Sequence, residues 1–167
     1  CGVPGGGFAR LRCDACGREE LVYFSCKGRG FCPSCGGRRM ADQAAHLVDR
    51  VLPHVPVRQW VFTLPWELRT LVAYNRKVLA AVRRIWWEEL SHWLCRRGEE
   101  EGVVAPRPGA VNVIQRFDSA LRLNVHFHTL VLSGIYAGEG EEALFHELPT
   151  PTPDDLALIL HKICFRL

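Results

Sequence analysis

Most cysteines of this sequence lie near its N-terminus, at a spacing that suits a metal ion. Six of the eight fall within the first 35 residues: Cys1, Cys13, Cys16, Cys26, Cys32 and Cys35. Four of these form two C-x2-C pairs, Cys13 with Cys16 and Cys32 with Cys35. A two-residue gap lets two thiolates turn onto one ion, and four thiolates close a tetrahedral site. We therefore predict a structural zinc site rather than a disulfide framework, since the sequence shows no export signal.

Cys1 and Cys26 remain outside these pairs. They could join a second metal site or exchange with a cysteine of the first, and the sequence leaves both arrangements open. Cations flank the second pair: Lys27, Arg29, Arg38 and Arg39. On a small zinc module these cations could contact phosphates, although a solvated loop accounts for them equally well.

A second group with metal-binding chemistry is the triplet His126-Phe127-His128. It lies in a strand-like run, and residues i and i+2 of a strand point to the same face. Both imidazoles can then reach one metal ion while Phe127 faces the core. The triplet alone is a weak signal, because it also occurs in cupins and metal hydrolases and two such histidines can simply be surface residues.

The hydrophobic pattern predicts the elements that position these groups. Three segments have strand character: residues 57–64, 110–117 and 125–136. We expect the last two to pair antiparallel, and Trp60, Phe62 and Leu64 to share one face of the first. Residues 98–109 are expected to form a linker, and residues 137–153 a loop.

Helical periodicity covers residues 37–52, 65–97 and a last segment from Leu156. Asn75 is expected to cap a second helix within 65–97, and Asp154 or Asp155 the last one. In the first helix the apolar residues at helical spacing are Met40, Ala44, Leu47, Val48 and Val51. In the last helix the residues expected to face inward are Leu156, Ile159, Leu160 and Ile163. We interpret the four tryptophans from Trp66 to Trp93 as core residues, with base stacking as the alternative.

Composition limits the class of protein. Of the 167 residues 48% are hydrophobic and 23% charged, so there is enough apolar surface for a core. No apolar run approaches the length of a membrane span, and we expect a cytoplasmic protein with no membrane partner. The net charge of +3 is uneven, with a basic excess in residues 1–58 and an acidic one in residues 137–167, which fits a nucleic-acid partner only weakly.

Five motifs, in order, resemble the rolling-circle transposases of one bacterial insertion-sequence family, which belong to the HUH endonuclease superfamily. They are Cys1-Gly2, GFARLRCDACG at 7–17, FSCKGRGFCPSCGGRRM at 24–40, VFTLPWELR at 61–69 and VIQRFDSALRLNVHFHTLVLSGIY at 113–136. The family usually has proline where this chain has Val125. The resemblance covers nearly the whole chain.

The resemblance implies an α+β protein in two parts, a zinc-binding module followed by an HUH nuclease domain. We expect the zinc module over residues 1–40. A helical connection with one strand over 41–109 then begins the transposase domain, and an HUH nuclease core over 110–167 is incomplete at its C-terminal end. In the superfamily, two histidines and a third polar group hold Mg or Mn, which polarises a phosphate of single-stranded DNA before a tyrosine attacks. His126 and His128 match these histidines, and we prefer Gln115 to Asp118 as the third ligand.

The nucleophile is the main departure from the family, whose catalytic tyrosines lie downstream on a helix. The sequence has only Tyr23, Tyr74 and Tyr136, which we interpret as packing residues. We therefore expect a fragment or a decayed copy of a transposase, beginning with Cys1 rather than Met, that binds DNA at single-stranded transposon ends but is inactive alone. The alternatives are a zinc-dependent DNA-binding fragment without catalysis and, more distantly, an unrelated metal hydrolase.

Overall fold

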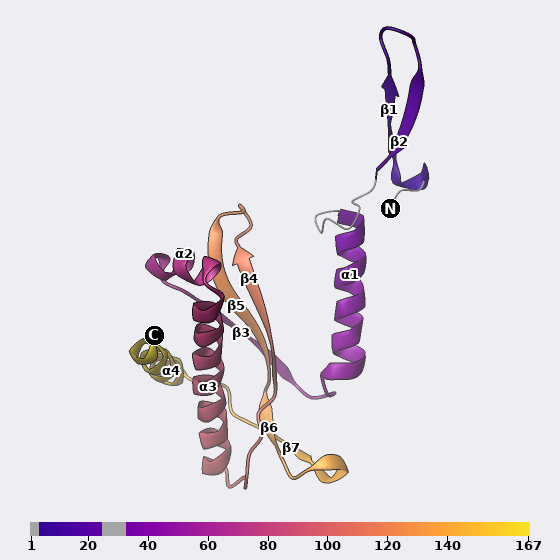
Figure 1. Ribbon diagram of the computed structural model, residues 1–167. Helices are drawn as coiled ribbons and strands as arrows, with labels where there is room; N and C mark the ends of the chain where they lie inside the picture. Colours follow the sequence, from indigo (N-terminus) through magenta and orange to yellow (C-terminus); the bar gives the residue numbers. More distant parts are fainter. Residues whose placement is uncertain (1–3, 25–32) are drawn as a thin grey trace. The chain divides into compact units, whose positions relative to one another are not determined.

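The computed structural model describes residues 4–24 and 33–167, which belong to two compact units, Cys1–His54 and Val55–Leu167 (Figure 1). Residue 40, the expected end of the zinc module, lies inside a helix, and the segments on the two sides of residue 109 contribute strands to one sheet.

The first unit contains a hairpin and a helix. A 3-10 turn, Pro4–Gly6, precedes strands β1 (Phe8–Arg12) and β2 (Glu19–Tyr23), which pair antiparallel. Helix α1 (Pro33–His46) continues into a π-helical turn, Leu47–Val51. The predicted helix is thus present, and it begins at a proline, which suits the first helical position. Its apolar stripe is not buried within the described residues, since the exposed fractions of Met40 and Val48 are 73% and 57%.

The second unit is built on a three-stranded antiparallel sheet with the order β3-β5-β4. Its strands are β3 (Val57–Thr63), β4 (Ala110–Phe117) and β5 (Leu123–Leu132). The central strand β5 pairs with β3 on one side and β4 on the other, so β4 is an edge strand. The pairing of β4 with β5 confirms the antiparallel pair predicted from the sequence.

Three helices belong to this unit: α2 (Trp66–Tyr74), α3 (Arg76–Glu100) and α4 (Pro153–Arg166). Asn75 caps α3 as predicted, and its side-chain oxygen accepts hydrogen bonds from the backbone N–H groups of Lys77 and Val78. The cap of α4 differs from the prediction. Thr152 is the N-cap, and Asp155 completes a capping box with it, because proline follows Thr152 at the first helical position.

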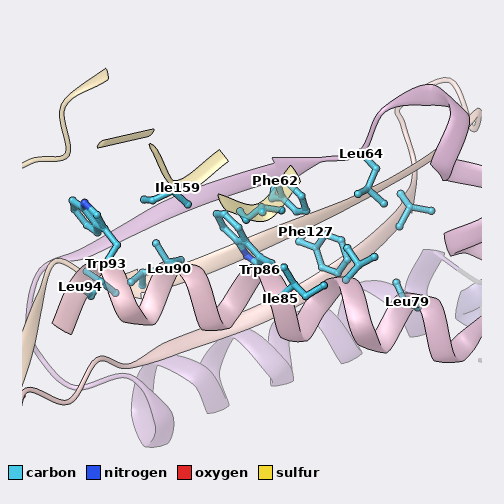
Figure 2. Packing of buried hydrophobic residues seen from close by; sticks show 14 of the residues in the cluster. Phe62, Leu64, Leu79, Ile85, Trp86, Leu90, Trp93, Leu94, Phe127 and Ile159 are labelled. Carbon is cyan, nitrogen blue, oxygen red and sulfur yellow. The ribbon is translucent and has the colours of Figure 1, made fainter. Parts of the chain in front are cut away.

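The core lies between α3 and one face of the sheet (Figure 2). The ring of Trp86 on α3 stacks on Phe62 of β3 with centroids 4.9 Å apart, and Phe62 also packs on Phe127 of β5. Ile159 and Ile163 of α4 are buried in the same cluster. The expected inward stripe of α4 is only half present, because Leu156 and Leu160 remain exposed.

Two segments depart from the predicted elements. The strand expected over residues 125–136 breaks after Leu132, and β6 (Gly134–Ala137) follows as part of a separate hairpin. Its partner β7 (Leu144–Glu147) lies in the segment expected to be loop and follows a 3-10 turn, Gly140–Glu142. Gly134 makes this pairing possible, since a Cβ there would lie 2.1 Å from the carbonyl oxygen of His146.

The linker expected from residue 98 also begins later, because α3 continues to Glu100. Gly98 therefore lies inside a helix, where its missing side chain makes room for Ile135. Taken together, helices and antiparallel sheets form an α+β architecture, as the sequence predicts. Over residues 4–24 and 33–167, we find no helix with the length and apolar character needed to span a membrane.

Candidate functional site

Strand β5 places His126 and His128 on the sheet face opposite the core. Between them, Phe127 is fully buried against α3, so alternation along the strand turns both imidazoles to the other face. The two rings lie edge to face with centroids 4.9 Å apart. His126 is buried and His128 half-buried. The structure therefore brings the two predicted ligands side by side.

A backbone carbonyl determines which nitrogen of His126 is free. Its Nδ1 lies 2.6 Å from the carbonyl oxygen of Asn124. Because a carbonyl oxygen only accepts, Nδ1 must carry the proton and donate it. The Nε2 atom then keeps its lone pair, which is the form of imidazole that binds a metal ion.

Gln59 orients His128 and was missed by the sequence analysis. It lies on β3, and its side-chain Nε2 is 2.6 Å from Nδ1 of His128. In this orientation the amide nitrogen donates to Nδ1, so the proton of the neutral ring is on Nε2. A half-turn of the amide would present its oxygen to an Nδ1–H instead and leave Nε2 free. The only available signal was the alternation of β3, which places Gln59 on the face opposite Trp60 and Phe62.

The preferred third ligand, Gln115, lies directly across from His126 in the β4–β5 register. A register shift follows it, between Gln115 and Phe117, and the Gln115 amide donates a hydrogen bond to the Phe117 carbonyl at 3.2 Å. Such bulges re-aim side chains near functional sites. On the other side of His126, the register partner is Thr63 of β3.

Asp118, the ligand we did not prefer, is engaged within its own turn. Its carboxylate accepts hydrogen bonds from the backbone N–H groups of Ala120 and Arg122 and from the Arg122 side chain. The Arg122 N–H, with smaller contributions from the other donors, lowers the pKa of this carboxyl despite some opposing desolvation. The carboxylate therefore serves the β4–β5 turn.

The donor set limits which ion fits this face. Within the part of the chain that the structure describes, no three His, Cys, Asp or Glu residues gather as metal ligands. Two imidazoles and an amide make an open set that water or phosphate oxygens would complete. Because imidazole nitrogen is softer than the oxygen ligands that Mg prefers, Mn suits this set better than Mg.

The first C-x2-C pair forms the tip of the β1–β2 hairpin. The Cys13 N–H donates to the Arg18 carbonyl, and the Gly17 N–H donates to the Cys13 carbonyl, both at 2.8 Å. Gly17 has a φ of 70°, in the left-handed region that favours glycine. Hydrogen bonds from the backbone N–H groups of Cys16 and Ala15 lower the pKa of the Cys13 thiol. We refer to this turn, residues 13–17, as the hairpin knuckle. It favours the thiolate form of Cys13, which is the form that binds zinc.

The remaining predicted residues of this module are described only in part. Cys1, Cys26, Lys27, Arg29 and Cys32 lie outside the described residues. Cys35 lies in the first turn of α1, although the structure does not describe its side chain. Arg38 and Arg39 follow on α1 and are exposed.

The tyrosines have different surroundings. Tyr23 packs edge to face on Phe8 in the hairpin, and Tyr136 packs on Phe145 in the β6–β7 hairpin. Tyr74 does not fit the packing interpretation, because it ends α2 with an exposed fraction of 82%.

Comparison with known proteins links the N-terminal part of the chain, and the segment that contains β4 and β5, to transposases. Residues 1–64 match a family described as "Transposase zinc-binding domain", and residues 109–153 match one described as "Putative transposase". The chain is 32% identical over 150 residues to the "Transposase for insertion sequence element IS801" of Pseudomonas savastanoi pv. phaseolicola, which covers 89% of this chain and 34% of that protein.

A second relative is the "Putative transposase y4qJ" of Sinorhizobium fredii (strain NBRC 101917 / NGR234). It is 27% identical over 134 residues, which cover 78% of this chain and 31% of that protein. The chain thus spans about a third of the length of these two curated relatives. No solved structure matches it.

Proposed function

Because the chain belongs to the transposases of insertion sequences, we propose that it serves DNA transposition through two metal-dependent parts. In this proposal the first unit is a structural zinc module, and the second binds single-stranded DNA at an HUH-type site. The observation that carries the proposal is the pair of imidazoles on one sheet face, with Nε2 of His126 left free by the Asn124 carbonyl.

Zinc would be held by Cys13, Cys16, Cys32 and Cys35, with Cys1 and Cys26 as further candidates. The hairpin knuckle supports this assignment, because its N–H groups stabilise the Cys13 thiolate. Four sulfur ligands leave no open coordination position, so the role of zinc is structural.

A divalent cation, Mn or Mg, would be held by His126 and His128, with Gln115 as the third protein ligand. Bound there, it would act as a Lewis acid that neutralises charge on a DNA phosphate. The chain's own contribution is orientation: the Asn124 carbonyl accepts the hydrogen bond of Nδ1 of His126 and leaves its Nε2 as a ligand. Gln59 would do the same for His128 once its amide is turned so that the oxygen faces Nδ1. Phosphate oxygens of a single strand would complete the open set of donors.

We further propose that the 167-residue chain binds the strand without forming a covalent bond to it. Of its three tyrosines, Tyr136 lies beyond the end of β5, in the strand β6, and its ring is packed on Phe145. A covalent bond to the strand needs a side-chain nucleophile placed at the polarised phosphate, and a bound cation does not supply one.

The test measures binding of a labelled single-stranded oligonucleotide by fluorescence anisotropy, with Mn, with Mg and without added divalent cation, so that no chelator removes the structural zinc. We expect Mn to strengthen binding, and His126→Ala combined with His128→Ala to abolish only that increment. The salt-dependent part should remain, because it comes from cations elsewhere. Equal affinity with and without Mn in the unchanged protein would overturn the proposal for this site.

A denaturing gel tests the absence of a covalent adduct. After incubation with the labelled strand and Mn, the 167-residue chain should give no shifted, protease-sensitive band. If such a band forms, Tyr74→Phe and Tyr136→Phe identify the attacking residue, and the exposed Tyr74 is the first to test.

A second candidate function is DNA binding by the zinc module without any role for the histidines. The exposed Arg38 and Arg39 on α1 favour it. Binding that is lost on Arg38→Gln with Arg39→Gln, and that is indifferent to Mn, would support this second function. No observation favours the unrelated metal hydrolase.

A further inference from the structure

A groove runs between α3 and the edge strand β4, on the helix side of the sheet. It has a volume of about 830 Å³ and is lined on α3 by Lys77, Arg83, Arg84 and Trp87 and on β4 by Asn112. We refer to it as the α3–β4 groove. Asn112 pairs with Thr129 on the core side, whereas the next residue of β4 pairs with His128. The groove and the histidine pair therefore lie on opposite faces of the β4–β5 ladder.

Small side chains create the groove. Ala80 and Ala81 of α3 line the groove on the helix side, and Ala110 of β4 lines it on the strand side. The side chain of Asn112 is held at the floor, because its amide donates a hydrogen bond to the Thr129 hydroxyl at 2.6 Å. The volume lies in the range of about 300–1,000 Å³ that is usual for ligand sites.

The charge of the groove is entirely positive. Its lining contains three cations and no carboxylate. Within the described part of the chain, Lys77 and Arg83 form no ion pair, while Arg84 contacts Glu88 at 3.3 Å. Glu88 also forms an ion pair with Arg166 of α4, so the Glu88 carboxylate is shared between two arginines. An anion in the groove would therefore meet at least two cations that are not already neutralised.

One wall of the groove carries an aromatic ring. Trp87 follows Trp86 in the sequence, yet Trp86 is 4% exposed and donates its indole N–H to Thr129 in the core. Trp87 points to a different side of the helix and is partly exposed. The expectation that the tryptophans of this region are core residues therefore fails at Trp87, as it does at Trp66, whose exposed fraction is 75%. The face of Trp87 is available for stacking.

We propose that the α3–β4 groove is a metal-independent binding site for single-stranded DNA. Cations along a backbone and an aromatic ring on which a base stacks are the two elements of such sites. Lys77 and Arg84 are seven residues apart, or about 10 Å along the helix, and that length matches about three stacked nucleotides at ~3.4 Å each. The proposal rests on the proposed function only for the choice of DNA as the nucleic acid.

A duplex fits less well. Its bases are stacked on one another and cannot offer a free face to Trp87, whereas an unpaired base can. A strand in the groove could pass around the edge strand β4 toward the histidine face, because no further strand pairs with β4 within the described sheet. The groove would then hold the strand while the histidine pair engages one phosphate.

The test uses the full chain without added divalent cation, with anisotropy of a labelled oligothymidylate of about 16 nucleotides, an upper site size for one binding module. Lys77→Gln with Arg83→Gln should weaken binding at least about tenfold and reduce the slope of log K against log salt by about 1.4, since each lost phosphate contact removes about 0.7. The matched control is Arg96→Gln with Lys162→Gln, which removes the same charge from the α3–α4 side and should change binding less than about twofold.

Stacking is tested separately. Trp87→Leu should weaken binding at least about fivefold and remove quenching of tryptophan fluorescence by the oligonucleotide, while Trp87→Phe keeps most of the affinity. Circular dichroism of each variant verifies folding. If Trp87→Leu does not fold, Trp87→Phe still tests stacking, because it keeps an aromatic ring and should keep most of the affinity. Equal losses in both charge variants, or no effect of Trp87→Leu, would overturn the proposal.

The expected loss of binding in the groove variants does not depend on the histidine site. Without added divalent cation, His126→Ala with His128→Ala should leave this binding unchanged. If the Mn-dependent increment is absent but the groove variants still lose affinity, the proposed function at the histidines fails and the groove stands. The reverse result overturns the groove alone.

Discussion

The value of His126 and His128 as ligands depends on the groups that hold their Nδ1 atoms. The Asn124 carbonyl can only accept a hydrogen bond, so it determines the tautomer of the neutral His126 ring without further help. For His128 the partner is a side chain, Gln59, from the neighbouring strand. Substitution of Gln59 can therefore weaken metal binding by the histidine pair without removing a metal ligand.

We expect Gln59→Ala to lower the affinity for Mn by about ten- to a hundredfold, the usual effect of losing a partner behind a metal-binding histidine. Gln59→Glu should keep or raise the affinity, because a carboxylate accepts the Nδ1 proton. Isothermal titration calorimetry with Mn measures both, and Gln43→Ala, an exposed glutamine on α1, is the matched control. Equal Mn affinity in all three variants would show that Gln59 does not orient His128.

A second prediction at this scale concerns Asp155 in the cap of α4. Hydrogen bonds from the Thr152 backbone N–H, with those from the Trp93 indole and the Thr152 hydroxyl, lower the pKa of Asp155 to about 2. A depressed folded-state pKa contributes stability above the unfolded value of about 4, and this contribution is lost as pH falls toward 2.

Asp155→Asn should therefore lower the free energy of unfolding by about 1 kcal/mol at pH 7, as for other lost helix caps, and by progressively less below pH 4. Urea denaturation followed by tryptophan fluorescence measures the difference between the two proteins at each pH. Asp154→Asn, in the same turn but without a side-chain hydrogen bond in the described structure, should have a smaller effect. A pH-independent difference would contradict the assignment.

At the scale of elements, the β6–β7 hairpin depends on the absence of a side chain at Gly134. A Cβ there would lie 2.1 Å from the His146 carbonyl oxygen and 2.9 Å from the Cα of Glu147. Both are backbone atoms, so relief requires the two strands to separate rather than a side chain to turn.

Gly134→Ala should therefore destabilise the second unit by about 2–3 kcal/mol, at the upper end of overpacking costs. Gly37→Ala is the contrasting change, since nothing lies within 4 Å of its Cβ position in α1, and alanine should stabilise that helix by up to about 1 kcal/mol. Thermal unfolding monitored by circular dichroism compares them. If Gly134→Ala unfolds like the unchanged protein, the strands are not as closely paired as described.

At the scale of the whole molecule, the two units depend on different forces. Every member of the hydrophobic cluster lies in the second unit, between Trp60 and Ile163. The described apolar side chains of the first unit are largely exposed, as Met40 and Val48 illustrate. A metal is therefore expected to supply the stability that a core supplies in the second unit.

We expect chelation of zinc, or Cys13→Ser with Cys16→Ser, to unfold the first unit and leave the second folded. The five tryptophans all lie in the second unit, so their fluorescence should be unchanged while far-ultraviolet circular dichroism loses the signal of α1. Elemental analysis should find at least one zinc ion in the folded protein. Folded protein without zinc would contradict the metal assignment, and Cys95→Ser serves as the control for loss of a thiol.

Groups close in the sequence could be predicted because they depend on local backbone geometry. A two-residue spacing brings Cys13 and Cys16 to one turn, and strand alternation puts His126 and His128 on one face. The three strands and the Asn75 cap follow from periodicity and side-chain chemistry in the same way. These features need no knowledge of what packs against them.

Only the tertiary structure decided which residues meet across strands and helices. The register of β3, β5 and β4 brings Gln59 to His128 and Gln115 to His126, and packing sends Trp86 inward but leaves Trp87 in a groove. The β6–β7 hairpin likewise arises from a close approach at Gly134 that composition did not reveal. Strand register and helix packing are set by contacts between residues far apart in the chain, and single-sequence periodicity carries no information about those partners.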